Sequence, residues 1–142
     1  MPNTLISREL AANRLREHGV APTAQRLEIA RSLFSLHMHV SAEQLLARVN
    51  ERSARVSKAT VYNTLRLFRE KGLVRVVIVD PTRVFYDPNT DPHHHFYDMD
   101  AGILTDIPAG DIKVSGVPTL PDGTVEAGVD IVIRTRARKT AG

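Results

Sequence analysis

Three of the six histidines are consecutive, at His93, His94 and His95. Because side chains alternate between the two faces of an extended strand, His93 and His95 are expected to point to one side and His94 to the other. Two imidazoles on one face at this spacing can chelate a divalent metal ion. Carboxylates stand on either side of the triplet in the sequence, at Asp87 and Asp106, and would strengthen such a ligand set.

A further histidine, His39, stands in a predicted loop in the front half of the chain. The 142 residues include no cysteine, which excludes disulfides, thiolate zinc sites, iron–sulfur clusters and a cysteine nucleophile. Imidazole and carboxylate donors together suit Fe²⁺, Mn²⁺ or Zn²⁺. The spacing alone leaves open whether these residues converge, since histidine-rich surface patches are common.

The segment from Ser57 to Lys71 carries a pattern typical of nucleic-acid binding. Its apolar residues recur at helical spacing, at Val61, Leu65 and Phe68. Lys58, Tyr62 and Arg66 share another face, where cations can contact phosphates and an aromatic ring can contact a thymine methyl group. The amide of Asn63 can pair with an adenine edge. The alternative is a solvated basic helix face with a half-buried tyrosine.

Caps and periodicity predict the elements that must position these residues. Residues 7–18 form a first helix, and a second begins near Pro22–Thr23. Ser41 and Gln44 form a capping box at the start of a third helix. Ser57 caps the fourth helix, which Gly72 ends.

After Gly72 the apolar period changes from that of a helix to that of a strand. Residues 73–79 and 83–87 are rich in Val, Ile, Phe and Tyr, and Asp80-Pro81-Thr82 between them is a turn sequence. The pair predicts a β-hairpin. Helices followed directly by a hairpin are typical of a winged helix, in which the last helix enters the major groove.

The composition of residues 88–92 is that of a linker. Beyond it, strands are predicted at 93–98, 103–107 and 129–134, with an ordered loop over 108–128. The predicted fold is α+β, with a winged-helix DNA-binding domain over 1–87, a hinge linker over 88–92, and a small, mostly β dimerisation and sensing domain over 93–142. A domain of roughly 50 residues buries too little surface alone, so we expect a homodimer formed through residues 93–134.

Charge is divided unevenly along the chain. Residues 1–90 carry 14 Lys and Arg against 8 Asp and Glu, whereas residues 91–142 carry 5 against 8. A basic front half favours a nucleic-acid partner, although halves this small also differ by chance. No apolar run approaches the roughly 20 residues that span a bilayer, and residues 1–9 lack the apolar core of a signal peptide. We therefore expect a cytoplasmic protein with no membrane partner.

Four motifs together resemble the ferric uptake regulator (Fur) superfamily: His18–Arg26, His39–Glu43, Ala59–Leu65 and His93–His95, within a match over about residues 10–107. The resemblance implies a dimer that binds an inverted-repeat operator in double-stranded DNA and senses a metal ion at the domain hinge. Carried over by position, the sensing ligands are His39, Asp87, His93, His95 and Asp106. The predicted DNA contacts are Arg26, Lys58, Thr60, Tyr62, Asn63 and Arg66.

The departures from the family pattern indicate one branch of the superfamily. Asp98 and Ala101 stand where most members have a CxxC pair, which implies that there is no structural zinc held by four cysteines, and the loop over 108–128 stands in place of a long helix. With Val129–Arg134, these features are similar to the iron response regulator (Irr) branch of alphaproteobacteria, which acts when iron is scarce and responds to haem. Without a Cys-Pro motif, haem is expected to bind through His93, His94 and His95. We expect a small divalent ion to support DNA binding and haem to oppose it.

Two rival interpretations belong to other classes. One is the peroxide-sensing branch of the same superfamily, whose carboxylate pattern Asp87 and Asp106 match and in which peroxide reacts with bound Fe²⁺ and a ligand histidine is oxidised. The missing structural zinc argues against it. The other is a metal-dependent hydrolase, since sets of His and Asp also activate water. No nucleophile or general base accompanies the ligands, so we expect a regulator and not an enzyme.

Overall fold

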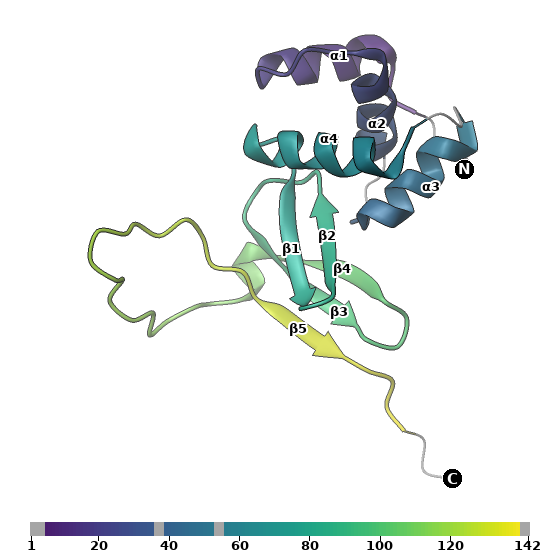
Figure 1. Cartoon of the computed structure of the whole chain (residues 1–142). Coiled ribbons are helices and arrows are strands. Elements are labelled where there is room, and N and C mark those ends of the chain that lie inside the picture. The colour runs from purple at the N-terminus through teal and green to yellow at the C-terminus, as the bar shows by residue number, and fades with distance from the viewer. Residues whose placement is uncertain (1–4, 36–38, 53–55, 140–142) are drawn as a thin grey trace. The chain divides into compact units, whose positions relative to one another are not determined.

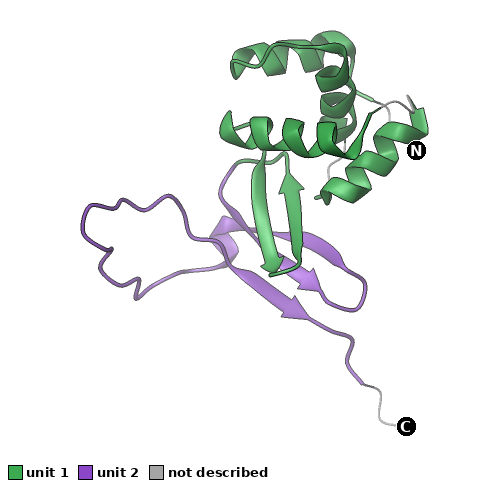
Figure 2. Ribbon diagram, viewed as in Figure 1, with its two compact units in different colours: residues 1–90 green, residues 91–142 purple. Residues whose placement is uncertain are grey.

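The computed structural model describes residues 5–35, 39–52 and 56–139. The chain divides into two compact units, Met1–Thr90 and Asp91–Gly142 (Figure 2). The described residues of the first unit form four helices followed by a two-stranded sheet, and those of the second form a three-stranded sheet. This composition confirms the predicted α+β class.

Side-chain oxygens cap the helices of the first unit, which are α1 (Arg8–Glu17), α2 (Ala24–Ser35), α3 (Ala42–Arg52) and α4 (Lys58–Glu70) (Figure 1). Ser7 accepts a hydrogen bond from the Leu10 amide at 3.1 Å. Ser41 and Gln44 form the predicted capping box, with reciprocal bonds of 3.1 and 2.9 Å. Each cap stabilises its helix by about 0.5–2 kcal/mol. None of the described helices is both long and apolar enough to cross a membrane.

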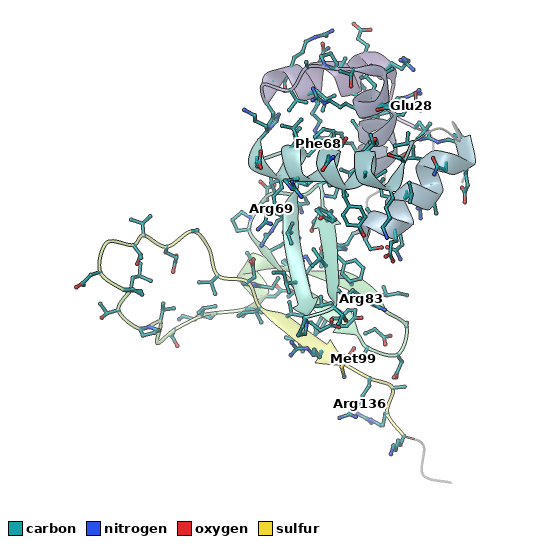
Figure 3. All side chains as sticks on the ribbon, in the orientation of Figure 1. Glu28, Phe68, Arg69, Arg83, Met99 and Arg136 are labelled. Carbon is teal, nitrogen blue, oxygen red and sulfur yellow. The ribbon has the colours of Figure 1, made fainter. Side chains whose placement is uncertain are left out.

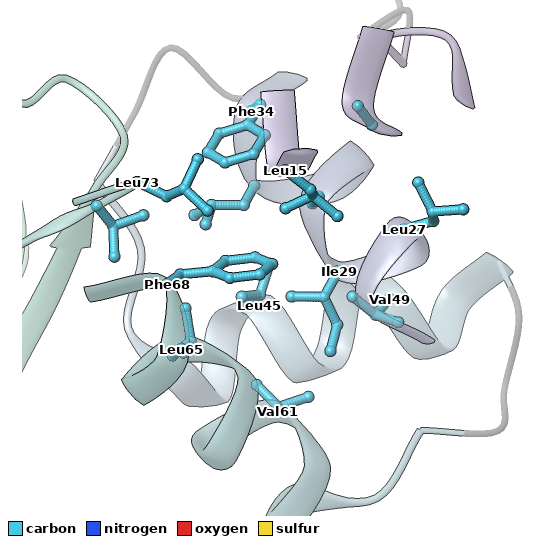
Figure 4. Packing of buried hydrophobic residues seen from close by; sticks show 14 of the residues in the cluster. Leu15, Leu27, Ile29, Phe34, Leu45, Val49, Val61, Leu65, Phe68 and Leu73 are labelled. Atoms are coloured by element: carbon cyan, nitrogen blue, oxygen red, sulfur yellow. The ribbon is translucent and has the colours of Figure 1, made fainter. Parts of the chain in front are cut away.

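One hydrophobic core holds the four helices together (Figure 4). Its fully buried side chains include Leu15, Ile29, Leu33, Leu45, Leu65 and Phe68. The ring of Phe34 stacks on that of Phe68, with centroids 6.2 Å apart. The apolar stripe predicted on α4 faces this core, because Val61, Leu65 and Phe68 are all buried. The remaining face of α4 is therefore left for contacts outside the unit's core.

The predicted hairpin is present as β1 (Arg75–Asp80) and β2 (Arg83–Asp87), which pair antiparallel. The expected start of its first strand at Leu73 is wrong. Leu73 and Val74 are buried with the helical core instead, and the Leu73 amide donates to the Phe68 carbonyl at 2.8 Å. These two residues thus complete the turn that ends α4 before the strand begins.

A single β-bridge ties the chain ahead of α3 to the hairpin. The amide of Val40 donates to the carbonyl of Tyr86 at 3.1 Å, and the amide of Tyr86 donates to the carbonyl of Val40 at 2.7 Å. The residues on either side of Val40 therefore lie along the edge of β2.

The sheet of the second unit has the order β4-β3-β5. The central strand β3 (His93–Asp98) pairs antiparallel with β4 (Ile103–Pro108) and parallel with β5 (Val132–Thr135). The predicted strand over 129–134 is displaced toward the C-terminus. Its first residues lead into the sheet instead, and the Ile131 carbonyl accepts from the His95 amide at 3.0 Å.

A long exposed segment joins the outer strands of this sheet. After a 3-10 turn, η1 (Ala109–Asp111), residues 112–131 follow an irregular path with no helix or strand (Figure 1). Residues 113–130 are all exposed, and they include the apolar side chains of Val114, Val117, Leu120, Val125 and Val129. A parallel strand needs a long crossover, which this segment supplies without the usual helix.

Candidate functional site

His93, His95 and Asp106 come together within the second unit. The pairing of β3 with β4 places His95 opposite Asp106. The Nε2 atoms of His93 and His95 lie 3.2 and 3.5 Å from the same carboxylate oxygen, Oδ1 of Asp106. The three side chains each offer a ligand atom within 4.8 Å of the others. Two imidazoles and a carboxylate at this spacing can bind one small cation.

His94 lies on the same strand but serves a different contact. Its Nδ1 accepts a hydrogen bond from the Ile131 amide at 3.1 Å. With the bond from the His95 amide to the Ile131 carbonyl, this contact fixes the point at which the chain enters β5. The geometry therefore gives the His94 ring a structural contact with the chain that enters β5.

His39 and Asp87 form a second pair, within the first unit. His39 Nε2 lies 2.9 Å from Asp87 Oδ2, and the two side chains are only 6% and 4% exposed. The other oxygen of Asp87 accepts from the Asn89 amide at 2.9 Å, which orients the carboxylate. Burial of an imidazole beside a carboxylate removes both from water, so their mutual contact must offset the loss of hydration.

The donor chemistry of both groups fits a divalent ion such as Fe²⁺, Mn²⁺ or Zn²⁺, because imidazole nitrogens and carboxylate oxygens are ligands that these ions accept. Haem does not fit the residues as they stand. Axial ligation needs an imidazole with an open face for the porphyrin, whereas His93, His94 and His95 are 6%, 8% and 0% exposed.

The exposed face of α4 gathers cationic, aromatic and amide side chains. Exposed residues on it are Lys58, Tyr62, Asn63, Arg66 and Arg69. Figure 3 labels two consecutive residues of α4 that lie on its two different faces: Phe68 is buried and Arg69 is exposed. The ammonium of Lys58 lies 5.8 Å from the centre of the Tyr62 ring, which is a cation–π contact.

The two other predicted DNA contacts occupy different positions. Thr60 belongs to the cap of α4, where its hydroxyl lies 2.9 Å from the Ser57 hydroxyl and its amide donates to the same oxygen. Arg26 lies in the first turn of α2, and its guanidinium donates to the Ala21 carbonyl at 3.0 Å. That bond holds the Arg26 side chain near the start of its helix.

Tyr86 is a further candidate functional residue, which the sequence pattern did not identify. It lies on β2, is half-buried and packs against the helical core. Burial raises the pKa of the Tyr86 phenol, the nearby Tyr62 raises that pKa further, and the Arg69 and Arg66 charges act in the opposite direction. An aromatic residue in a strand is ordinarily a packing residue, so no local signal marked it.

Sequence comparison identifies relatives over most of the chain. The profile of the ferric uptake regulator family matches residues 17–119. The peroxide-responsive repressors PerR of Staphylococcus epidermidis and Staphylococcus aureus are each 34% identical to this chain over 92 residues, or 65% of it. Those residues are 61% and 62% of the two proteins, so this chain spans about three fifths of the length of the curated relatives it matches.

Solved structures of the same family share the fold. The ferric uptake regulator of Pseudomonas aeruginosa with manganese superimposes with a TM-score of 0.70 at 23% identity, covering 92% of this chain and 99% of that one. The ferric uptake regulator of Vibrio cholerae gives a TM-score of 0.70 at 18% identity, covering 89% and 98%. With the profile match over 17–119, these similarities lead to one assignment: the chain belongs to the ferric uptake regulator family.

Proposed function

We propose that this protein is a DNA-binding transcriptional regulator in iron homeostasis, whose affinity for DNA depends on a divalent metal ion. The observation that carries the proposal is the cluster formed by the buried imidazoles of His93 and His95 and the exposed carboxylate of Asp106, in a chain whose α4 exposes a basic and aromatic face. Family membership supports it. We also propose that it acts as a homodimer on an inverted-repeat operator, in keeping with the exposed apolar side chains of the second unit.

The proposed metal ligands are His39, Asp87, His93, His95 and Asp106. The resemblance to the family implies this set, and the donor atoms suit the ion. When bound, the ion supplies a positive charge that neutralises the carboxylates, while the imidazoles remain neutral donors. A titration with Mn²⁺ that counts ions per chain distinguishes one shared ion from separate ions at the two groups.

In the proposed complex, α4 enters the major groove. Tyr62, Asn63 and Arg66 contact base edges, which gives sequence preference. Arg26, Lys58 and Thr60 contact phosphates, which gives affinity that falls with salt. The exposure of Lys58, Tyr62, Asn63 and Arg66 supports this placement of α4, because these side chains are available for contact with DNA.

The experiment is a selection of bound sequences from random double-stranded DNA by the full chain, with and without Mn²⁺. We expect a two-fold symmetric sequence to be enriched, and its affinity to fall by about 5- to 150-fold when a chelator removes the ion. Failure to enrich any sequence, or equal affinity in both conditions, contradicts the proposal. Turnover of a phosphate or peptide substrate without DNA binding favours the rival metal-dependent hydrolase.

A peroxide-responsive repressor is the second candidate, because the relatives at 34% identity carry that description. Both candidate functions involve DNA binding, and they differ in the signal that is sensed, which is peroxide in this second case. Hydrogen peroxide then abolishes DNA binding by the Fe²⁺-loaded protein but not by the Mn²⁺-loaded protein, and a peptide containing a ligand histidine gains the mass of one oxygen. Equal sensitivity of the two loaded forms excludes this candidate.

The resemblance to the iron response branch implies that haem is the signal molecule and that it binds through His93, His94 and His95. Since these imidazoles are buried, β3 must open locally before haem can bind, whereas a small ion can bind without such an opening. Titration with haemin of the wild type and of the double variant His93→Ala/His95→Ala decides the question. If the double variant still releases DNA on addition of haemin, these histidines are not the haem ligands.

A further inference from the structure

The two faces of β2 carry different groups. Side chains alternate along a strand, so Phe85 and Asp87 share one face while Val84 and Tyr86 share the other. On the first face, Asp87 meets His39. On the second, Tyr86 packs against the cluster that holds the four helices. Two neighbouring residues thus join a candidate metal ligand to the helical core.

The bridge between Val40 and Tyr86 makes this connection a backbone one. Because these residues exchange two hydrogen bonds in an antiparallel bridge, His39 and Asp87 are the next pair along the ladder. The side chains of such a flanking pair lie close together on one face. A change in the contact between His39 and Asp87 therefore acts directly on the bridge that includes Tyr86.

The side chain of Tyr86 packs against the core cluster to which α4 contributes Val61, Leu65 and Phe68. Charges of Tyr62, Arg66 and Arg69 all act on its phenol, and these three residues belong to the exposed face of that helix. Two of them, Tyr62 and Arg66, are proposed contacts to base edges. Tyr86 therefore packs against the core that holds α4, the helix whose placement decides how DNA would be contacted.

We propose that Tyr86 is a positioning residue that couples the His39–Asp87 pair to the DNA-contacting face of α4. The inference rests on the proposed function, since it describes how metal occupancy reaches the helix. When His39 and Asp87 are held together, the bridge closes and the Tyr86 ring fixes the hairpin against α4. When they separate, the bridge loosens and Tyr62 and Arg66 lose that support.

The test compares full-length Tyr86→Ala and Tyr86→Phe with a matched control, Val84→Ala. Val84 lies on the same face of β2, two residues from the bridge and opposite Ile78. The readout is the ratio of DNA affinities with and without Mn²⁺, measured on the selected operator, together with Mn²⁺ affinity in the absence of DNA. The ratio reports coupling between the two sites, whereas a loss that is merely structural lowers both affinities.

We expect Tyr86→Ala to lower the ratio by about 5-fold or more while Mn²⁺ affinity is retained. Tyr86→Phe keeps the ring and retains the ratio, as does Val84→Ala. An unchanged ratio in Tyr86→Ala, or an equal fall in Val84→Ala, overturns the inference and leaves the proposed function standing. A wild type whose DNA affinity ignores Mn²⁺ overturns the proposed function and this inference with it.

A measurement on the wild type covers the case in which Tyr86→Ala does not fold. The amides of Val40 and Tyr86 form the two bonds of the bridge. Zn²⁺, which is diamagnetic, is therefore expected to slow their hydrogen exchange and to shift the resonances of Tyr62 and Arg66. If the two bridge amides respond while α4 does not, Tyr86 does not couple the two regions.

Discussion

The imidazole rings of His93 and His95 meet edge to face, with their centroids 4.5 Å apart. Both direct an Nε2 atom at one oxygen of Asp106. The two imidazoles are buried, whereas the Asp106 side chain is 49% exposed. A cation shared among the three groups would offset the desolvation of the rings through direct ligation. The relationship makes the metal affinity of this cluster the first property to measure.

Replacing either imidazole by an amide is expected to weaken Mn²⁺ binding. His93→Gln and His95→Gln each remove one ligand while keeping a polar side chain, and a fall in affinity of at least about 10- to 100-fold is expected, the range seen even for lost supporting contacts. Isothermal titration gives the affinity. His18→Gln is the control, because His18 is outside the proposed ligand set and its ring contacts the Arg14 carbonyl at the end of α1. Unaltered affinity in both β3 variants would remove them from the ligand set.

The ion should also stabilise the folded chain. A ligand that binds only the native state adds about 2.7 kcal/mol to the free energy of unfolding at a concentration 100 times its Kd. Thermal unfolding with Mn²⁺ should therefore show a higher Tm, and a chelator should reverse the shift. A Tm that is the same with and without Mn²⁺ speaks against a site in the native protein.

Substitutions at two residues of α4 are expected to change DNA binding in different ways. Tyr62→Ala should cost about 1–3 kcal/mol of operator binding and blur sequence preference, because we propose that its ring contacts bases. Lys58→Ala should weaken binding to every sequence alike and lower the salt slope by about 1, because we propose that Lys58 contacts a phosphate. Affinities at several salt concentrations, on operator and on random DNA, separate the two. Equal loss of specificity from both variants would contradict the assigned roles.

The dimer prediction can be tested at the sheet of the second unit. Phe96 and Ile133 are register partners on β3 and β5, and their side chains are 42% and 40% exposed. Phe96→Asp places a charge on this apolar surface and should shift the protein toward monomer in sedimentation. Leu10→Asp is the control, since Leu10 is an exposed apolar residue of α1, at 61%. A wild type that sediments as a monomer with full DNA affinity would rule the dimer out.

Acid should loosen the turn of the hairpin. The hydroxyl and then the amide of Thr82, each donating at 2.8 Å, hold the pKa of the Asp80 carboxyl below its usual value. A lowered folded pKa means that the stabilisation is complete above the ordinary value, about 4, and is lost as the pH falls through the lowered one. The titration midpoint of Asp80, followed by NMR, should rise in Thr82→Ala. An unchanged midpoint in Thr82→Ala would show that the Thr82 hydroxyl does not lower the pKa of Asp80.

Local sequence determined the elements of this fold to within a few residues. Ser7, Ser41 and Ser57 begin their helices as predicted, because a cap satisfies amides only a few positions away. The turn Asp80-Pro81-Thr82 closes a hairpin for the same reason. The motifs around Tyr62 and His93 were also sufficient for the family, since they are contiguous in the sequence.

Tertiary structure alone decided which distant residues meet. Strand alternation placed His93 and His95 on one face, but the register that puts Asp106 opposite His95 is a property of the β3–β4 pair. The parallel pairing of β5, the contact of His94 with Ile131 and the bridge between Val40 and Tyr86 each join residues far apart in the chain. Such pairings depend on the packing of whole elements, and no local propensity encodes them. That is why the sequence could name the candidate ligands, while the role of Tyr86 emerged only from the folded chain.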